Sequence, residues 1–302
     1  MSGIVTLFGG AGFIGRHVLQ KLVQRGHVVR VASRNPAAGR GLCLGAEPGQ
    51  VVPMRVDLRD AAAIRQAVTG ASGVVNLVGI LAEGRAGDFD ALQHQGAGAI
   101  AKAAAEAGVK AMVQLSAIGA DAGSPSLYAR SKAAGEAAVL AAFPRAVVLR
   151  PSIVFGAEDA FFNRFAAIAR LSPIMPVFYG DTRFQPVWVE DVAEAVLHGL
   201  EQPALGGRIL ELGGPDIRTF RQLMGDVLRY TGLRRPVLEI PPRVAAWQAT
   251  IMECLPGKPL TRDQLLLLQR DNVVTGEDGF SILNMIPRPM DAIVPGYLHP
   301  AK

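Results

Sequence analysis

Cysteine and histidine are scarce in this chain, and each shortage excludes a class of site. The 302 residues include two cysteines, Cys43 and Cys254, which are too far apart for a paired metal-ligand motif or a disulfide framework. We expect both to be small buried residues of a reducing compartment. The five histidines are dispersed along the chain, so the sequence predicts no metal site.

Long hydrophobic runs are absent as well. No apolar stretch reaches the roughly 20 residues that a membrane-spanning helix needs, although half of the chain is hydrophobic. The first predicted strand begins a few residues after Met1, so we expect no signal peptide. The sequence predicts a cytoplasmic protein, or one that binds a membrane only peripherally.

Lysine is scarce relative to arginine. The chain carries 31 basic residues, 6 of them lysine, and a net charge of +5. No basic cluster alternates with aromatic residues, so we expect no binding of nucleic acid. A basic surface of this kind still suits an anionic membrane or an acidic protein partner.

Apolar strand patterns alternate with helical ones along the first half of the chain, which is typical of a doubly wound α/β fold with a parallel sheet. We expect a Rossmann domain over residues 1–155, its sheet completed by later segments around 185–215. A smaller, proline-rich α/β region is expected over 156–302. Strands are predicted at 3–8, 27–33, 51–56, 73–80, 110–116 and 146–150, and helices at 13–25, 60–69, 88–108 and 126–142.

The C-terminal half has three less regular features. Residues 161–178 are apolar, and we expect core packing, with an apolar ligand site as the alternative. Residues 243–255, around Trp247 and Met252, predict a helix that packs on the main domain, or alternatively one that binds a membrane surface. The tail beyond residue 273 is expected to run over the surface.

A glycine loop lies between the first predicted strand and the first predicted helix. Glycines at this point let the backbone approach a pyrophosphate, and the helix N-terminus then stabilises the negative charge. A tight turn without a ligand is the alternative that fits this position less well. The predicted dinucleotide contacts in this loop are Gly9, Ala11, Gly12, Phe13, Ile14 and Gly15.

No acidic residue ends the second predicted strand, where NAD-binding proteins place a carboxylate for the adenosine ribose. Ser33 and Arg34 stand there instead, and an arginine can pair with a 2′-phosphate. The sequence therefore favours NADP(H), with NAD(H) as the alternative; Arg34 can also be an ordinary solvated side chain. The other predicted cofactor contacts are Asp57 and Leu58, which follow the third strand, Val78 and Gly79 after the fourth, and Pro151 after the sixth.

The segment YARSK places Tyr128 and Lys132 four residues apart on one face of a predicted helix. A lysine ammonium beside the phenol predicts a lowered tyrosine pKa and hence a usable acid/base. The same lysine can hydrogen-bond the nicotinamide ribose. A coincidence on a helix surface is the alternative.

These segments, with LRPSIVFG (149–156) and QPVWVEDVAEAV (185–196), resemble an extended or atypical short-chain dehydrogenase/reductase, of the epimerase/dehydratase-like kind. The resemblance implies that a serine near the end of the fifth strand completes a Ser-Tyr-Lys set. Ser116 is the candidate, although Ala117 follows it where many active members have a second hydroxyl. Ser124 and Ser126 are other candidates, but capping of the next helix explains them.

The C-terminal third narrows the resemblance. LPGKPLTRDQLLLLQRDNVV (255–274) and MIPRPMDAIVPGYL (285–298) are similar to the branch that includes the nucleotide-binding accessory subunit of respiratory complex I and its bacterial relatives. This resemblance implies a structural dinucleotide, a place in the peripheral arm of complex I near the quinone pathway, and a location on the cytoplasmic face of the inner membrane. The alternative is an active NADP(H)-dependent oxidoreductase, epimerase or dehydratase linked to ubiquinone, with a hydrophobic small molecule or quinone as ligand.

Overall fold

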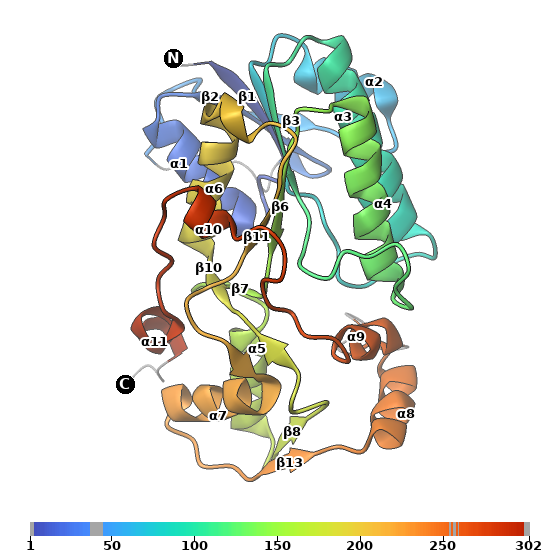
Figure 1. Cartoon of the computed structure of the whole chain (residues 1–302), viewed down its shortest axis with the longest axis vertical. Coiled ribbons are helices and arrows are strands. Elements are labelled where there is room, and N and C mark those ends of the chain that lie inside the picture. Colours follow the sequence, from blue (N-terminus) through green and yellow to red (C-terminus); the bar gives the residue numbers. More distant parts are fainter. Residues whose placement is uncertain (1–2, 37–44, 254, 256–257, 259, 299–302) are drawn as a thin grey trace.

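A seven-stranded parallel sheet forms the centre of the computed structural model, which describes residues 3–36, 45–253, 255, 258 and 260–298. The strand order is β11-β6-β5-β4-β1-β2-β3 (Figure 1). Successive strands are added on one side of β1 up to β3 and on its other side from β4 onward, as in dinucleotide-binding sheets. The predicted doubly wound α/β fold is therefore confirmed. The strands are β1 (Ile4–Phe8), β2 (Val28–Ser33), β3 (Val51–Arg55), β4 (Gly73–Asn76), β5 (Ala111–Leu115), β6 (Val147–Pro151) and β11 (Ile209–Leu212).

Helices cover both faces of this sheet, which explains why its strands are apolar throughout. Two of them, α1 (Phe13–Gln24) and α6 (Val189–Glu201), pack on one face. The opposite face carries α2 (Ala61–Val68), α3 (Gly96–Glu106) and α4 (Leu127–Ala142). Because the seven strands are parallel, their carboxyl ends all lie on the same side of the molecule.

Two predicted elements differ from the structure at their ends. The predicted strand 73–80 ends at Asn76, whose side chain accepts a 3.1 Å hydrogen bond from Val78 N and turns the chain. The predicted helix 88–108 starts as a π-helix, η2 (Asp90–Gln95), and continues as α3. A Cβ at Gly135 of α4 would lie 2.0 Å from the Gln93 carbonyl oxygen, so the two backbones are in contact here.

A smaller lobe below the sheet is built from the C-terminal half of the chain (Figure 1). Its core holds Phe162, Met175 and Val177, all fully buried, so the core role predicted within residues 161–178 is confirmed for these three side chains, whereas Leu171 is 89% exposed. The elements are β7 (Val154–Phe155), α5 (Phe162–Leu171), β8 (Met175–Val177), β9 (Arg183–Phe184), β10 (Val187–Trp188), β12 (Arg218–Thr219), α7 (Phe220–Thr231), β13 (Val237–Glu239), α8 (Pro242–Met252) and α9 (Arg262–Leu267). The short 3-10 helix η3 (Pro203–Leu205) follows α6 and buries Leu205 in the core of the main sheet.

The tail runs over the surface for much of its length, as its composition suggests, but buried side chains anchor it. It forms α10 (Gly279–Ile282), α11 (Met290–Ile293) and α12 (Pro295–Leu298). Phe280 and Val294 are buried, each in a different core cluster, because the tail runs from the sheet to the smaller lobe.

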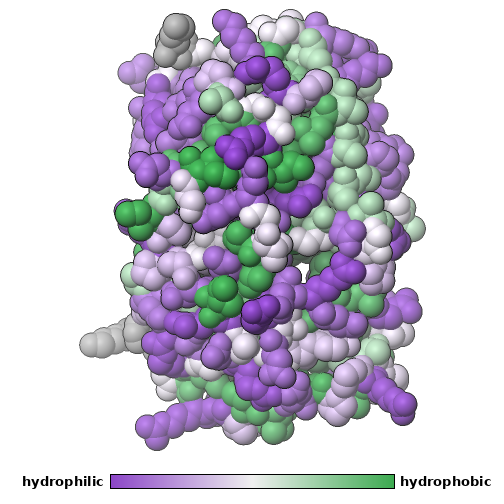
Figure 2. Space-filling view, in the orientation of Figure 1, coloured by the Kyte–Doolittle hydropathy of each residue, from purple (hydrophilic) through white to green (hydrophobic). Residues whose placement is uncertain are grey.

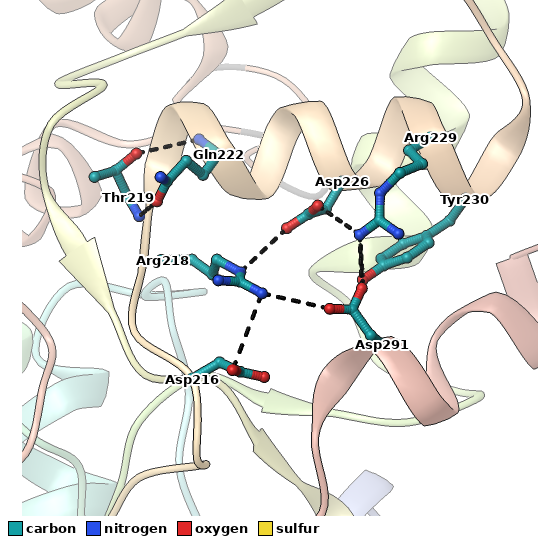
Figure 3. Close-up of polar contacts among 8 residues, drawn as sticks. All are labelled: Asp216, Arg218, Thr219, Gln222, Asp226, Arg229, Tyr230 and Asp291. Atoms are coloured by element: carbon teal, nitrogen blue, oxygen red, sulfur yellow. Dashed lines mark hydrogen bonds and ion pairs between the residues drawn. The ribbon is translucent and has the colours of Figure 1, made fainter.

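Polar contacts fix the tail to α7. Asp291 accepts a 2.6 Å hydrogen bond from Arg229 and another from the Tyr230 hydroxyl, and it lies 3.4 Å from Arg218 (Figure 3). The side chain of Asp226 faces the same two arginines from within α7. This network binds α11 to the smaller lobe.

Helix α8 packs less than its sequence suggests. Only Ala245 and Ala249 of this helix are buried, whereas Trp247 is 66% exposed. The favoured interpretation, that Trp247 packs on the main domain, is therefore wrong. Within the described part of the chain, no helix is long and apolar enough to cross a membrane. Cys43 and Cys254 lie outside the described residues.

Candidate functional site

The glycine loop connects β1 directly to α1 and is built on close backbone contacts. Gly9 has a φ of +80°, and its carbonyl accepts a 3.0 Å hydrogen bond from Gly12 N. A Cβ at Gly15 would lie 2.3 Å from the Gly9 carbonyl oxygen and 2.6 Å from Gly10 Cα. The loop therefore folds back on the first turn of α1, which only glycine at position 15 permits.

The N-terminus of α1 is free to bind an anion. Gly12 is its N-cap residue, so no side chain caps the helix, and its first turn holds no acidic residue. Ala11, Phe13 and Ile14 are partly exposed around this turn, next to buried Gly15. Unpaired backbone N–H groups and the helix dipole make this a suitable site for a pyrophosphate. The neighbouring Arg16 forms an exposed ion pair with Glu158 at 3.4 Å.

A groove of about 460 Å³ lies beyond the loop, where the adenosine of a dinucleotide would extend. Arg34 and Asp57 line it, as the sequence suggests, and Leu58 packs beneath in the core. Ser33 lies at the end of β2 and donates to the Asn35 carbonyl at 2.9 Å. The sequence reasoning missed the other lining residues, which are Arg59, Gly84, Arg85 and Asp88.

Charges inside this groove are partly paired. Arg59 donates to Asp88 at 2.6 Å, and Asp88 also accepts from the backbone N of Arg85, which holds the pKa of that carboxyl below its usual range. Asp57 accepts from Arg59 N at 3.0 Å and so also shapes the turn before α2. Arg34 has no hydrogen-bond partner among the residues that the structure describes. Arg59 lies two residues after Asp57 in the sequence and could have been found from it, whereas nothing in the sequence around Arg85 indicates that its loop reaches this groove.

Lys132 lies at the other end of the site, buried in α4. Its ammonium donates to the Leu115 carbonyl at 3.3 Å, and a Cβ at Gly79 would lie 3.1 Å from Nζ. Burial lowers the pKa of Lys132 to about 8, opposed by the Glu136 carboxylate one turn further along. The ammonium has three N–H groups, and the Leu115 carbonyl accepts from one of them. A ribose hydroxyl could accept from another.

Tyr128 does not form the expected pair with Lys132. Nζ lies 5.9 Å from the centre of the phenol ring, and the Tyr128 hydroxyl has no hydrogen-bond partner among the described residues. Burial raises the pKa of Tyr128 to about 12, so the predicted lowering is wrong in direction. Desolvation dominates because the ammonium donates to a backbone carbonyl and lies over the ring, without a hydrogen bond to the phenol oxygen.

Ser116 directly follows β5 and is 4% exposed, yet its hydroxyl has no hydrogen-bond partner within the part of the chain that the structure describes. Such a buried orphan costs stability unless a ligand satisfies it. Ser126 is the N-cap of α4 and accepts from Ala129 N at 3.2 Å, which bears out its capping role, and buried Ser124 accepts from Ser126 N. Of these three serines, Ser116 is therefore the best candidate to hydrogen-bond a ligand.

Other predicted contacts end neighbouring strands on the same side of the sheet. Val78 and Gly79 follow β4, and Pro151 ends β6 with its carbonyl accepting from Ile118 N at 3.0 Å. Together with the glycine loop, Ser116 and Lys132 they occupy the carboxyl edge of β1, β4, β5 and β6, the usual place for a dinucleotide. No group of described residues has the composition of a metal site.

Comparison with known proteins agrees with this geometry. The sequence pattern of the NAD dependent epimerase/dehydratase family matches residues 5–213, which include the glycine loop, Tyr128 and Lys132. The chain belongs to this family. Its seven-stranded parallel sheet and short-chain dehydrogenase/reductase-like topology are those of the family's fold.

Two curated relatives of this family member span most of its length. The mitochondrial NADH dehydrogenase (ubiquinone) 1 alpha subcomplex subunit 9 of Arabidopsis thaliana is 37% identical over 287 residues, which are 91% of this chain and 70% of that protein. The ceramide reductase of Caulobacter vibrioides is 30% identical over 244 residues, 79% of this chain and 74% of that one.

Solved structures share the fold at lower identity. The NADPH-dependent quinone oxidoreductase QOR2 of Escherichia coli, complexed with NADPH, superposes with a TM-score of 0.77 at 17% identity. The match covers 97% of this chain and 99% of that one.

Proposed function

We propose that this protein is an accessory subunit of the complex I type that retains a dinucleotide, NADP(H) in preference to NAD(H), as a structural component. The observation that carries the proposal is the glycine loop, with its Gly15 contact and uncapped α1 N-terminus, in a chain similar over most of its length to a complex I subunit. The unpaired Tyr128 phenol and Ala117 support slow or absent turnover. A bound dinucleotide stabilises the fold by RT ln(1 + L/Kd), where L is the free dinucleotide concentration.

The residues present fit such a cofactor. Gly9, Gly12 and Gly15 would hold the pyrophosphate. Lys132 and Ser116 would form hydrogen bonds with the nicotinamide end of the dinucleotide. When bound, the dinucleotide supplies redox chemistry. The chain itself binds it, orients it and excludes water through the burial of Ser116 and Lys132.

Arg34, Arg59 and Arg85 support the preference for NADP(H), because three guanidinium groups at the adenosine groove suit a 2′-phosphate. We expect Arg34→Leu to weaken NADPH binding about 10- to 100-fold, because one charge-assisted pair with the 2′-phosphate is lost. NADH has no 2′-phosphate, so its binding should change little. Arg65→Leu, on the exposed face of α2, is the matched control. Equal weakening of both dinucleotides would contradict the preference.

The main test uses protein purified without added nucleotide. Mass spectrometry of the denatured protein identifies what it retains, and the intact protein is assayed for hydride exchange with quinones and carbonyl compounds. Stoichiometric NADP(H) without turnover, and co-purification with complex I subunits, are the expected results. An empty site with turnover that Tyr128→Phe abolishes would overturn the structural role.

The second candidate is an active NADP(H)-dependent oxidoreductase, epimerase or dehydratase, which the ceramide reductase relative and the buried orphan hydroxyl of Ser116 favour. Tyr128 would be the acid/base, Lys132 its partner and Ser116 the group that polarises the substrate. Cofactor binding would have to bring Lys132 toward Tyr128 and lower its pKa. A hydrophobic molecule or quinone is the proposed ligand.

Peripheral binding to the cytoplasmic face of the inner membrane is also part of the proposal. Val244, Trp247 and Ile251 share one face of α8 and are 43%, 66% and 47% exposed, with Arg243 beside them. The lower end of the molecule mixes hydrophobic and hydrophilic residues (Figure 2). Sedimentation with phosphatidylglycerol vesicles should decrease in Trp247→Ser and not in Trp188→Phe; equal sedimentation would contradict it.

The domain division at residue 155 remains a proposal. A separate core cluster, whose members lie between Phe155 and Leu298, supports it.

A further inference from the structure

Residues 260–272, which we call the C-terminal strap, run along the carboxyl edge of the sheet. The strap starts with a capping box at Thr261, forms α9 and ends at Asn272, which forms an isolated parallel bridge with Phe184 of β9. In Figure 1, α9 lies directly below the first turn of α4, the helix that carries Tyr128 and Lys132.

Asp263 binds the N-terminus of α4 from this strap. Its carboxylate accepts hydrogen bonds from Leu127 N at 2.6 Å, Ser126 Oγ at 2.8 Å and Tyr128 N at 3.2 Å. A carboxylate at the positive end of a helix dipole, bonded to otherwise unpaired N–H groups, stabilises that turn. The first turn of α4 is thus fixed by a residue 135 positions later than Tyr128.

The far end of the strap binds the loops after β5 and β6. Asn272 donates to the Ile118 carbonyl at 3.0 Å and accepts from Ser152 Oγ at 2.6 Å. Arg270 pairs with Asp121 at 2.6 Å. These loops directly follow Ser116 and Pro151, at the edge where the nicotinamide end is proposed to lie.

The opposite side of the strap is fixed to the smaller lobe. Leu265 is buried against Phe178, Ala245 and Ala249, and Asp271 pairs with Arg183 at 2.6 Å. The strap therefore joins α4, both post-strand loops and the smaller lobe. None of them can move away from the carboxyl edge without breaking strap contacts.

We infer that the C-terminal strap retains the bound dinucleotide and that Asp263 is the positioning residue that keeps it closed over the nicotinamide end. The inference rests on the proposed dinucleotide site. Release requires the Tyr128 end of α4 to separate from α9, so loss of the Asp263 hydrogen bonds speeds release.

The test measures NADPH release from the loaded full-length protein, as the loss of bound NADPH fluorescence after mixing with excess NADP⁺. Asp263→Ala should release NADPH about tenfold faster, the effect of losing a helix cap, and Asp263→Asn by less. Asp278→Ala is the matched control, since Asp278 likewise caps a helix, accepting from Phe280 N at 3.1 Å at the start of α10, which lies outside the strap. It should release NADPH at the wild-type rate.

Hydrogen exchange of a peptide spanning residues 124–134 is the second readout. Faster exchange there, with unchanged exchange in β1–β5, shows that the variant opens α4 locally and keeps its fold. If exchange rises while NADPH release stays at the wild-type rate, the strap does not retain the cofactor and the inference is wrong.

Should Asp263→Ala fail to fold, Arg270→Gln opens the far end of the strap, and the same comparison of release rates decides the matter. Wild-type protein that binds neither NADPH nor NADH overturns the proposed function and this inference together. Wild-type binding with unchanged release in both strap variants overturns the inference alone.

Discussion

Glu136 and Arg150 face each other in a two-fold hydrogen-bonded ion pair, with 2.8 and 2.6 Å between their side-chain nitrogen and oxygen atoms. The pair joins α4 to β6, and Glu136 is 4% exposed. On its other side Arg150 approaches Glu211 of β11 at 3.7 Å, and Glu211 accepts from Thr275 N at 2.7 Å. A continuous polar contact therefore links the helix that carries Lys132 to the tail.

Glu136→Gln should lower the free energy of unfolding by about 2–3 kcal/mol, because the largely buried Arg150 guanidinium loses its hydrogen-bonded carboxylate and keeps only the 3.7 Å contact with Glu211. Urea denaturation measures the loss. Glu106→Gln is the control, since its 4.0 Å contact with Lys102 is exposed, and its effect should stay within about 0.5 kcal/mol. Equal effects of the two substitutions would show that the buried pair adds nothing.

Lys132→Met should stabilise the apoprotein by about 3 kcal/mol at pH 7, because burial lowers the lysine pKa from 10.5 to about 8. Below pH 8 the lysine is charged in both folded and unfolded states, so the full burial penalty is present. Between pH 8 and 10.5 the folded state loses the proton first, so the stability of the wild type rises relative to the variant.

Denaturation of both proteins at pH 7 and pH 10 measures this change, with exposed Lys102→Met as the control. A constant difference between wild type and Lys132→Met across that range would contradict the lowered pKa.

Gly15→Ala should abolish dinucleotide retention and cost about 2 kcal/mol or more, because the new Cβ overlaps the Gly9 carbonyl and Gly10 Cα. Gly225→Ala is its counterpart in α7. A Cβ there meets no atom within 4 Å, so helix propensity alone should stabilise the protein by about 1 kcal/mol. Thermal unfolding and the nucleotide content of each variant are measured. Retention of nucleotide in Gly15→Ala would contradict a pyrophosphate site at the glycine loop.

Asp291→Asn should destabilise the protein by roughly 1 kcal/mol at pH 7, since Asp291 holds the tail to α7 from a partly exposed position. Hydrogen bonds from Tyr230 and Arg229 lower the pKa of Asp291 in the folded state. The contribution is therefore fully present above pH 4 and lost as the pH falls through the lowered pKa. Thermal unfolding from pH 7 to pH 3 should show wild type and variant converging, and a difference that stays constant over this range would contradict the lowered pKa.

Local patterns sufficed to predict the sheet, the glycine loop and most helix bounds, because alternation, glycine spacing and capping residues act over a few positions. Asp60 is an example of such a local capping residue, since it caps α2 by accepting from Ala62 N at 2.9 Å. The apolar segment 161–178 was likewise readable as core.

Contacts between distant segments were not readable. Nothing near Asp263 indicates that it caps a helix at residue 127, and nothing in the proline-rich tail indicates that Val294 is fully buried. The pKa of Tyr128 was predicted in the wrong direction for the same reason. Helical spacing brings Lys132 near the phenol, whereas the Leu115 carbonyl, which belongs to another element, decides where the ammonium points.

The pairing of β11 with β6 has a consequence for synthesis of the chain. Strand β6 ends at Pro151, and the strand that covers its outer side begins only at Ile209. A nascent chain that has released the first six strands from the ribosome therefore exposes an apolar strand with unpaired backbone groups for the time needed to add about 60 residues. Such strands template aggregation. Translational pauses or premature stops between these two positions should thus be more harmful to the cell than those after residue 212.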